Sequence, residues 1–251
     1  MAETATTGWP VPLVTGYVDR SAETKSLQTF DERVDPAHTA LIIIDMQNDY
    51  CAPGGASDRH SGQAERFQKI IPPNKALLEE ARRCGALPVF VQMGFEPYAL
   101  YNSGADLLMR AKKFGLEAVA IKGSWGHEVV DELAPLPHEI RLEKHRSSAF
   151  QGTDLDLLLR SNGIHNVVVT GVVTHGCVYC TTIDAIMADY YTTLCRDCVM
   201  TTRDDLHNAA LLVMESKLQE KGVVSSEEVI ATWQRWRARQ EAPVAVRGHR
   251  T

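Results

Sequence analysis

The sequence lacks several features that would place it in particular protein classes. No apolar run approaches the roughly 18 residues that span a bilayer, so we expect no membrane partner. The first residues, MAETATTGWP, contain neither a basic nor an apolar region, and we therefore expect no secretory signal. Glycine and proline are spread along the chain, without a repeat or a low-complexity tract. What is left is an ordinary globular composition, with 44% hydrophobic residues in a chain of 251.

An excess of positive charge is also absent. The net charge of -6 gives no support for a nucleic-acid partner. The one basic run, RWRAR at 235–239, lies close to Glu227, Glu228 and Glu241, and we interpret it as a solvated helix end. Six cysteines without a secretory signal favour reduced thiols and a cytoplasmic location.

Alternating buried strands and helices indicate the fold class. Continuous apolar runs predict strands at 39–45, 87–93, 165–173 and 192–201, with weaker ones near 118–122 and 139–142. Helical spacing and capping residues predict helices at 72–85, 153–164, 180–191 and 204–216. Such alternation predicts a single-domain, three-layer α/β/α fold with a mostly parallel central sheet.

The ends of the chain differ from this pattern. Residues 1–38 are polar and irregular, and we expect an extended N-terminal arm that lies over the domain or a neighbouring subunit. Residues 39–220 form the predicted globular domain, and residues 221–251 form a C-terminal helix and tail.

Chemistry in parallel sheets gathers at the carboxyl ends of the strands. Asp45, Met93, Lys144 and Cys177 all fall at or just past a predicted strand end. Cys177 stands where the next helix begins, and free N–H groups and the helix dipole favour a thiolate there. Its alternative role is that of a small buried apolar residue.

Asp45 and Lys144 could assist such a thiolate. Asp45 ends an otherwise apolar strand and needs a partner if it is buried, so its alternative is a cap or a structural ion pair. Lys144 taken alone is typical of a surface lysine. A thiol needs a base or a cation to become a competent nucleophile near neutral pH, and these two residues could supply both.

The strings LIIIDMQNDY, EKHRSSAF and VTGVVTHGCV resemble the three catalytic blocks of the isochorismatase-like cysteine hydrolase family. The similarity covers about residues 39–216. It implies that Asp45 is the general base, Lys144 the catalytic lysine and Cys177 the nucleophile of a catalytic triad. It also implies a cis peptide at Val172–Val173, an oxyanion hole formed by the amides of Val173 and Cys177, and a homo-oligomer, either a dimer or a tetramer.

Within that family, members that keep Asp, Lys and Cys are amidases. The resemblance therefore implies a cysteine-dependent hydrolase that cleaves a C–N bond of a small amide, ureido or carbamoyl substrate through a thioester. The stretch 121–135, IKGSWGHEVVDELAP, is most similar to ureidoacrylate and carbamoyl-type amidohydrolases. Two alternatives stay open: a vinyl-ether hydrolase without covalent catalysis, and a non-catalytic binding protein on the same fold.

Metal binding is not expected. The nicotinamidase branch of the family carries metal-binding histidines near the second strand, where this chain reads VQMGFEPYALY, so we expect neither metal nor cofactor. Two Cys-x-x-Cys pairs, Cys177 with Cys180 and Cys195 with Cys198, have a spacing that often marks structural zinc. A predicted helix of roughly 15 Å separates them, which argues against one shared ion.

Further residues are candidates for substrate binding. Gln47 and Gln92 could bind polar atoms, Arg146 could bind a carboxylate, and His175 lies two residues before Cys177. Each has a structural alternative as a cap, an ion pair or a surface residue. Aromatic side chains that could line the pocket, or belong instead to the core or an interface, are Trp125 and Phe150, together with Phe95, Tyr98 and Tyr101.

Overall fold

One sheet of six parallel strands organises the computed structural model, which describes residues 26–96, 103–115 and 119–241. The strand order is β3-β2-β1-β4-β5-β6. β1 occupies the middle and pairs with β2 on one side and β4 on the other. The strands span Thr39–Ile44 (β1), Leu87–Met93 (β2), Ile140–Lys144 (β3), Asn166–Val172 (β4), Tyr191–Met200 (β5) and Val223–Val224 (β6).

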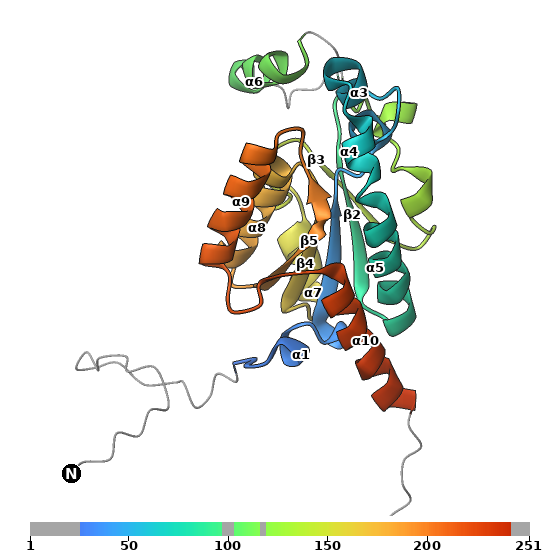
Figure 1. The fold of residues 1–251 in the computed structure, drawn as a ribbon, viewed down its shortest axis with the longest axis vertical. Helices are drawn as coiled ribbons and strands as arrows, with labels where there is room; N and C mark the ends of the chain where they lie inside the picture. The colour runs from blue at the N-terminus through green and yellow to red at the C-terminus, as the bar shows by residue number, and fades with distance from the viewer. Residues whose placement is uncertain (1–25, 97–102, 116–118, 242–251) are drawn as a thin grey trace, which may run out of the picture.

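Helices cover both faces of this sheet (Figure 1). Leu41 and Ile43 of β1 point to a core shared with α5 (Ile71–Cys84) and α10 (Ser226–Glu241). Ile42 and Ile44 point to the opposite core, shared with α7 (Leu155–Ser161), α8 (Tyr179–Met187) and α9 (Asp204–Lys217). Because alternate residues of a strand face opposite sides, a central strand must be apolar throughout, as TALIII is. The predicted three-layer α/β fold is confirmed.

The four helices predicted from the sequence all form, with ends that differ from the prediction by up to four residues. The helix predicted at 180–191 ends at Met187, because β5 begins at Tyr191, and the helix at Gly104–Phe114 had not been predicted. α5 carries proline in its first turn and ends at Gly85, whose φ of 82° closes the helix in the left-handed region. The longer helices are α5 (Ile71–Cys84), α6 (Gly104–Phe114), α7 (Leu155–Ser161), α8 (Tyr179–Met187), α9 (Asp204–Lys217) and α10 (Ser226–Glu241). Shorter α-helices are α1 (Phe30–Arg33), α2 (Asn48–Cys51), α3 (Ala56–Ser61) and α4 (Ala64–Gln68).

One predicted strand does not form. Within 119–122, Ile121 makes only an isolated bridge with Phe95. The backbone cannot extend there because Ala120 has a φ of 55°, and its N–H donates to the Asp49 carboxylate at 2.7 Å instead of to a strand. The other weak prediction, near 139–142, corresponds to β3.

Both ends of the described chain pack against the domain. Residues 26–38, predicted as irregular, contain α1, which the capping box of Thr29 and Glu32 begins, followed by a 3-10 turn. Helix α10 packs against α5, and its buried Trp233 donates to the carbonyl of Val34 at 2.7 Å. The rest of the predicted arm, residues 1–25, and the tail, 242–251, lie outside the described residues.

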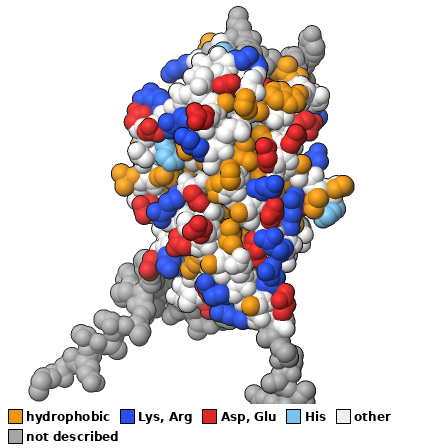
Figure 2. Space-filling model, turned by 45° about the vertical axis from the view of Figure 1, so that its right-hand side comes forward, with side chains coloured by type: hydrophobic (Ala, Val, Ile, Leu, Met, Phe, Trp, Pro, Cys, Tyr) orange, Lys and Arg blue, Asp and Glu red, His pale blue; other side chains and the backbone are white. Residues whose placement is uncertain are grey.

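The basic run at 235–239 lies on α10 and meets acidic partners. Arg235 and Arg239 pair with Asp31, and Arg237 pairs with Glu80. Acidic and basic side chains alternate over the surface on this side of the molecule (Figure 2). Among the helices described, none has the length and apolar character that crossing a membrane requires.

Candidate active site

Three strands bring polar side chains together at the carboxyl edge of the sheet, beside a cavity. Asp45 follows β1, Lys144 is the last residue of β3, and Cys177 lies beyond the end of β4. The cavity measures about 230 Å³. Its lining comprises Asp45, Tyr50, Met93, Asp106, Met109, His145, Arg146, Ser147, Val172, Val173, His175, Gly176 and Cys177.

Lys144 links the other two candidates. Its ammonium donates to Asp45 Oδ2 at 2.8 Å, to Cys177 Sγ at 3.2 Å and to the carbonyl of Arg146 at 3.2 Å. An ammonium has three N–H donors, so this fully buried lysine has a partner for each of them. Burial alone would lower the pKa of Lys144, but its electrostatic interactions and hydrogen bonds with Asp45 and Cys177 outweigh burial and raise that pKa. Lys144 is therefore a cation held between a carboxylate and a sulfur.

Asp45 leaves β1 with a left-handed backbone, at a φ of 51°. Aspartate tolerates this region better than most residues, and here it turns the side chain out of the strand. The carboxylate is 3% exposed, yet only Oδ2 is bonded; within the described residues Oδ1 has no hydrogen-bond partner. A buried oxygen with unused lone pairs at a cavity can accept a proton.

Cys177 is reached through an unusual stretch of backbone. The Val172–Val173 peptide is cis, as the resemblance implied, and the chain then turns through Thr174–Val178 into α8. Just before it, Gly171 has a φ of 112°, and a Cβ there would lie 2.0 Å from the carbonyl oxygen of Ile44. Only glycine lets β4 approach β1 so closely, immediately beside Asp45.

The other cysteines differ from Cys177. All six are free, and Cys195 and Cys198 lie buried in β5. Burial raises the pKa of Cys180, with Asp184 adding to that effect and Lys144 opposing it, and burial also raises the pKa of Cys198. In the described part of the chain, no group of three His, Cys, Asp or Glu side chains could hold a metal ion.

Two of the further substrate-binding candidates line the cavity. Arg146 lies on its wall and donates to the carbonyl of His145 at 2.7 Å. His175 also lines it, with Nδ1 3.0 Å from Thr201 Oγ1.

The remaining candidates that the structure describes lie outside the cavity lining. The amide of Gln47 bonds the N–H and carbonyl of Met93 and the carbonyl of His127, so it fastens backbone segments together. Gln92 donates to that same His127 carbonyl, and Trp125 is 56% exposed. Phe150 packs against the core on the α7 side, Phe95 makes a backbone bridge, and Tyr98 and Tyr101 fall outside the described residues.

Several lining residues had not been predicted. His145 and Ser147 directly follow β3, so the strand-end rule could have identified them. Asp106 and Met109 come from α6, three residues apart and thus on one helix face. They do not follow a predicted strand end, so the rule that located the other candidates did not point to them.

Comparison with known proteins identifies the class. The Isochorismatase domain model matches residues 39–228. The ureidoacrylate amidohydrolase RutB of Caulobacter vibrioides is 35% identical over 194 residues, which is 73% of this chain and 86% of that protein. The N-carbamoylsarcosine amidase of Thermoplasma acidophilum has a similar structure, with a TM-score of 0.59 and 28% identity over 75% of this chain and 96% of the other.

A cysteine hydrolase from Pseudomonas syringae shares the fold at a TM-score of 0.70, with 23% identity over 85% of this chain and 99% of that one. The fold and the relatives together define a hydrolase of the amidohydrolase class. The chain belongs to the isochorismatase-like family, as its three sequence blocks predicted.

Proposed function

We propose that this enzyme hydrolyses a C–N bond of a small amide, ureido or carbamoyl compound through a thioester on Cys177. The observation that carries the proposal is the position of the Lys144 ammonium, within hydrogen-bonding distance of both Asp45 and Cys177 beside a cavity. A volume of about 230 Å³ suits a small substrate, because drug-sized ligands occupy roughly 300–1,000 Å³.

The first half-reaction forms the thioester. Asp45 takes the thiol proton of Cys177, and its Oδ1, which lacks a hydrogen-bond partner within the described residues, can accept that proton. The sulfur attacks the carbonyl carbon, while the Lys144 cation stabilises the developing negative charge. We assign the oxyanion hole to the amides of Val173 and Cys177, both of which line the cavity. Protonated Asp45 returns its proton to the leaving nitrogen as the C–N bond breaks, which releases ammonia or an amine.

The second half-reaction restores the enzyme. Asp45, now a carboxylate again, removes a proton from water, and the resulting hydroxide attacks the thioester carbon. The C–S bond breaks, the acid leaves, and the cysteine sulfur recovers its proton from Asp45. As proposed, neither half-reaction uses a metal or a cofactor.

Replacement of Cys177 tests the mechanism. Cys177→Ala should lower kcat by a factor on the order of 10⁴ or more without changing the thermal melting temperature much, because the side chain is small and partly exposed. Mass spectrometry of the parent enzyme, quenched during turnover, should show an acyl adduct on Cys177 that is absent from Cys177→Ala. Normal turnover by that variant contradicts the proposal.

Two alternatives predict different results. A vinyl-ether hydrolase without covalent catalysis would survive alkylation of Cys177, and a non-catalytic binding protein would release no ammonia from any member of a panel of carbamoyl, ureido and carboxamide acids. We favour the ureido and carbamoyl part of the panel because the chain is similar to a ureidoacrylate amidohydrolase and an N-carbamoylsarcosine amidase.

We also propose a homo-oligomer, a dimer or a tetramer. Large apolar side chains stand exposed on three helices: Leu108 on α6, Met187 on α8 and Leu212 on α9, between 69% and 78% exposed. Light scattering coupled to size-exclusion chromatography would measure the mass, and a single species of 27.8 kDa contradicts the proposal. A cytoplasmic location stays a prediction, supported by six free thiols.

A further inference from the structure

Cys180 lies beside the proposed nucleophile but takes no part in the proposed mechanism. It follows Cys177 by three residues, in the first turn of α8. Both residues are in the thiol form and partly exposed. Within the described residues, no hydrogen bond holds the Cys180 sulfur. The other cysteines of the chain are buried: Cys51, Cys84, Cys195 and Cys198.

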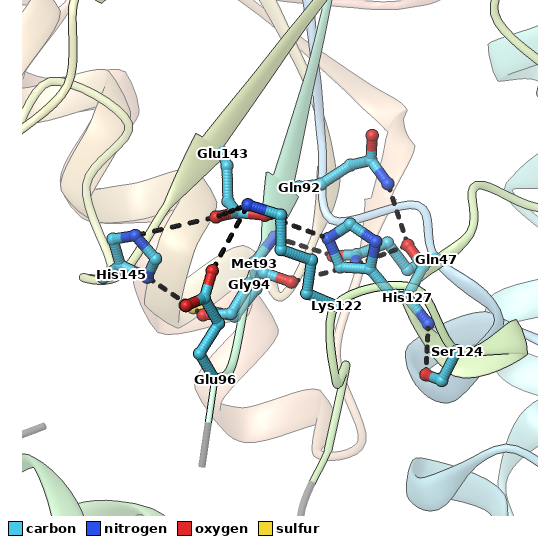
Figure 3. Close-up of polar contacts among 10 residues, drawn as sticks. All are labelled: Gln47, Gln92, Met93, Gly94, Glu96, Lys122, Ser124, His127, Glu143 and His145. Atoms are coloured by element: carbon cyan, nitrogen blue, oxygen red, sulfur yellow. Dashed lines mark hydrogen bonds and ion pairs between the residues drawn. The ribbon is translucent and has the colours of Figure 1, made fainter. Parts of the chain in front are cut away.

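The flank of the site beyond β3 is built differently, because its polar side chains pair with one another (Figure 3). Glu143, the residue before Lys144, accepts from Lys122 at 3.2 Å, and its second carboxylate oxygen lies 3.5 Å from Nε2 of His127. Lys122 also donates to Glu96 at 3.3 Å. These groups serve one another, and none of them is a thiol. Cys180 differs from them in both respects.

The backbone brings the two cysteines within reach of a disulfide. Val178 and Tyr179, which lie between them, have helical φ and ψ of −61° and −52°, and of −58° and −52°. Two helical residues place the flanking Cα atoms about 5 Å apart, and disulfides join Cα atoms roughly 4.4–6.8 Å apart. Closing the bond needs the Cβ atoms to approach by about 1–2 Å. Gly176, which is non-helical directly before Cys177, has the conformational freedom to absorb that shift.

Lys144 acts on both sulfurs. Its ammonium donates to Cys177 Sγ at 3.2 Å. Burial raises the pKa of Cys180 and Asp184 adds to this, but the charge of Lys144 acts in the opposite direction. A nearby cation favours the thiolate, which is the form of cysteine that oxidants attack. Cys177, bonded to Lys144 and open to the cavity, is therefore the sulfur that reacts first.

We propose that Cys177 and Cys180 form a redox modification site, at which a peroxide converts the nucleophile reversibly into a disulfide. The Cys177 thiolate attacks one peroxide oxygen, the O–O bond breaks, and the second oxygen leaves as water or an alcohol with the proton that the thiol gave up. Cys180 then attacks the sulfenic acid: the S–S bond forms, the S–O bond breaks, and the hydroxyl leaves with the Cys180 proton as water. The two sulfurs lose two electrons in all, which the peroxide takes up.

Reversibility is what Cys180 adds to the site. A sulfenic acid without a neighbouring thiol is oxidised further to a sulfinic acid, which thiol reductants do not restore. A disulfide is opened by thiol exchange, which returns both cysteines. Hydrolysis should therefore stop while the bridge exists and resume after its reduction. This inference goes beyond the proposed function and shares Cys177 with it.

Peptide mapping of the parent enzyme tests the bridge directly. The enzyme is treated with hydrogen peroxide, denatured in the presence of iodoacetamide and digested with trypsin. Cleavage after Arg160 and Arg196 gives one peptide, 161–196, that contains Cys177, Cys180 and Cys195. Before peroxide treatment this peptide should carry an alkyl group on each cysteine. Afterwards it should carry one on Cys195 alone and lack the mass of two hydrogen atoms.

Activity towards a substrate from the amide panel measures the consequence. Peroxide should lower kcat of the parent enzyme at least about tenfold, and dithiothreitol should restore most of it. Cys180→Ser should match the parent enzyme before treatment, because that sulfur has no role in hydrolysis. After peroxide it should recover less than about a tenth of its activity, because the sulfenic acid of Cys177 is oxidised further.

Cys84→Ser is the control, because it makes the same substitution at a buried cysteine. It should lose and recover activity as the parent enzyme does. A control that fails to recover, as Cys180→Ser should, would contradict a specific role of the pair. If Cys180→Ser does not fold, the peptide map of the parent enzyme decides the question.

The outcomes separate this inference from the proposed function. A peptide that stays alkylated on Cys177 and Cys180 after peroxide treatment, or a Cys180→Ser variant that recovers as well as the parent enzyme, overturns the modification site and leaves the thioester mechanism standing. A bridge between Cys177 and Cys180, in an enzyme whose Cys177→Ala variant turns over normally, supports the modification site and overturns the proposed function.

Discussion

The two sides of the cavity are built differently. Asp45, Lys144 and Cys177 come from the ends of strands in one sheet, and Lys144 has a partner for each of its donors. The opposite side takes Asp106 and Met109 from α6, and Met109 is 56% exposed. A parallel sheet fixes the ends of its strands through many hydrogen bonds, whereas a surface helix is held by few contacts. The sheet side is therefore suited to the reaction shared by the family, and the helix side to the choice of substrate.

The largest expected effect comes from replacing Lys144, which lies at the centre of the sheet side of the cavity. Lys144→Met removes the cation between Asp45 and Cys177, and leaves a buried carboxylate without a counter-charge. We expect activity to be lost and the free energy of unfolding to fall by about 3–5 kcal/mol, as when one partner of a buried ion pair is removed. Urea denaturation followed by circular dichroism measures the stability. A variant as stable as the parent enzyme would show that the buried Asp45 carboxylate does not need the charge of Lys144 for stability.

A milder change on the same side separates chemistry from stability. Asp45→Asn keeps an oxygen that can accept from Lys144 but removes the base. We expect kcat to fall by a factor of about 10²–10⁴, with a smaller loss of stability than in Lys144→Met. Pre-steady-state kinetics would show whether thioester formation is the slowed step. If kcat is unchanged, Asp45 is not the base.

The helix side should respond in KM instead. Met109→Ala enlarges the cavity without touching the reacting groups, so we expect KM to rise by no more than about tenfold and kcat to stay nearly constant. Trp125→Ala is the matched control, because Trp125 is exposed to the same degree but lies outside the lining. Its KM should stay within about twofold of the parent value. A large loss of kcat in Met109→Ala would remove the distinction between the two sides.

The smallest expected effect concerns the loop before Cys177. Thr174 Oγ1 lies 2.9 Å from Nδ1 of His207, and burial lowers the pKa of His207, with Arg66 adding to this effect and Asp204 opposing it. The unfolded chain thus binds a proton at His207 more tightly than the folded chain does. As pH falls below the ordinary imidazole value of about 6.5, this difference favours unfolding, so the free energy of unfolding rises with pH in that window.

His207→Gln removes that titration and should make the rise with pH shallower. Urea denaturation at a series of pH values between about 5 and 7 measures the slope for both proteins. The same slope in both would mean that His207 has equal proton affinity in the folded and unfolded chains. His138→Gln, the same substitution at an exposed histidine, is the control for this measurement.

The sequence alone determined the layers of the fold and the three central residues. Continuous apolar runs such as TALIII can be buried on both faces only as central strands of a parallel sheet, and polar residues at their ends then meet at one edge. The strand-end rule made Asp45, Lys144 and Cys177 candidates, and the resemblance to the family's three sequence blocks implied the role of each. The prediction of an irregular stretch before residue 39 was wrong at α1, although Thr29 and Glu32 have the spacing of the capping box that begins this helix.

Tertiary structure alone decided the rest of the cavity. Gln47 and Gln92 looked like binding residues, but backbone groups distant in sequence occupy their amides. The opposite holds for Asp106 and Met109, which reach the cavity because α6 lies beside it. A side chain's partners depend on which segments meet in space, and no local pattern encodes that meeting. The strand ends could therefore be predicted from the sequence, whereas the part of the cavity lining that comes from α6 could not.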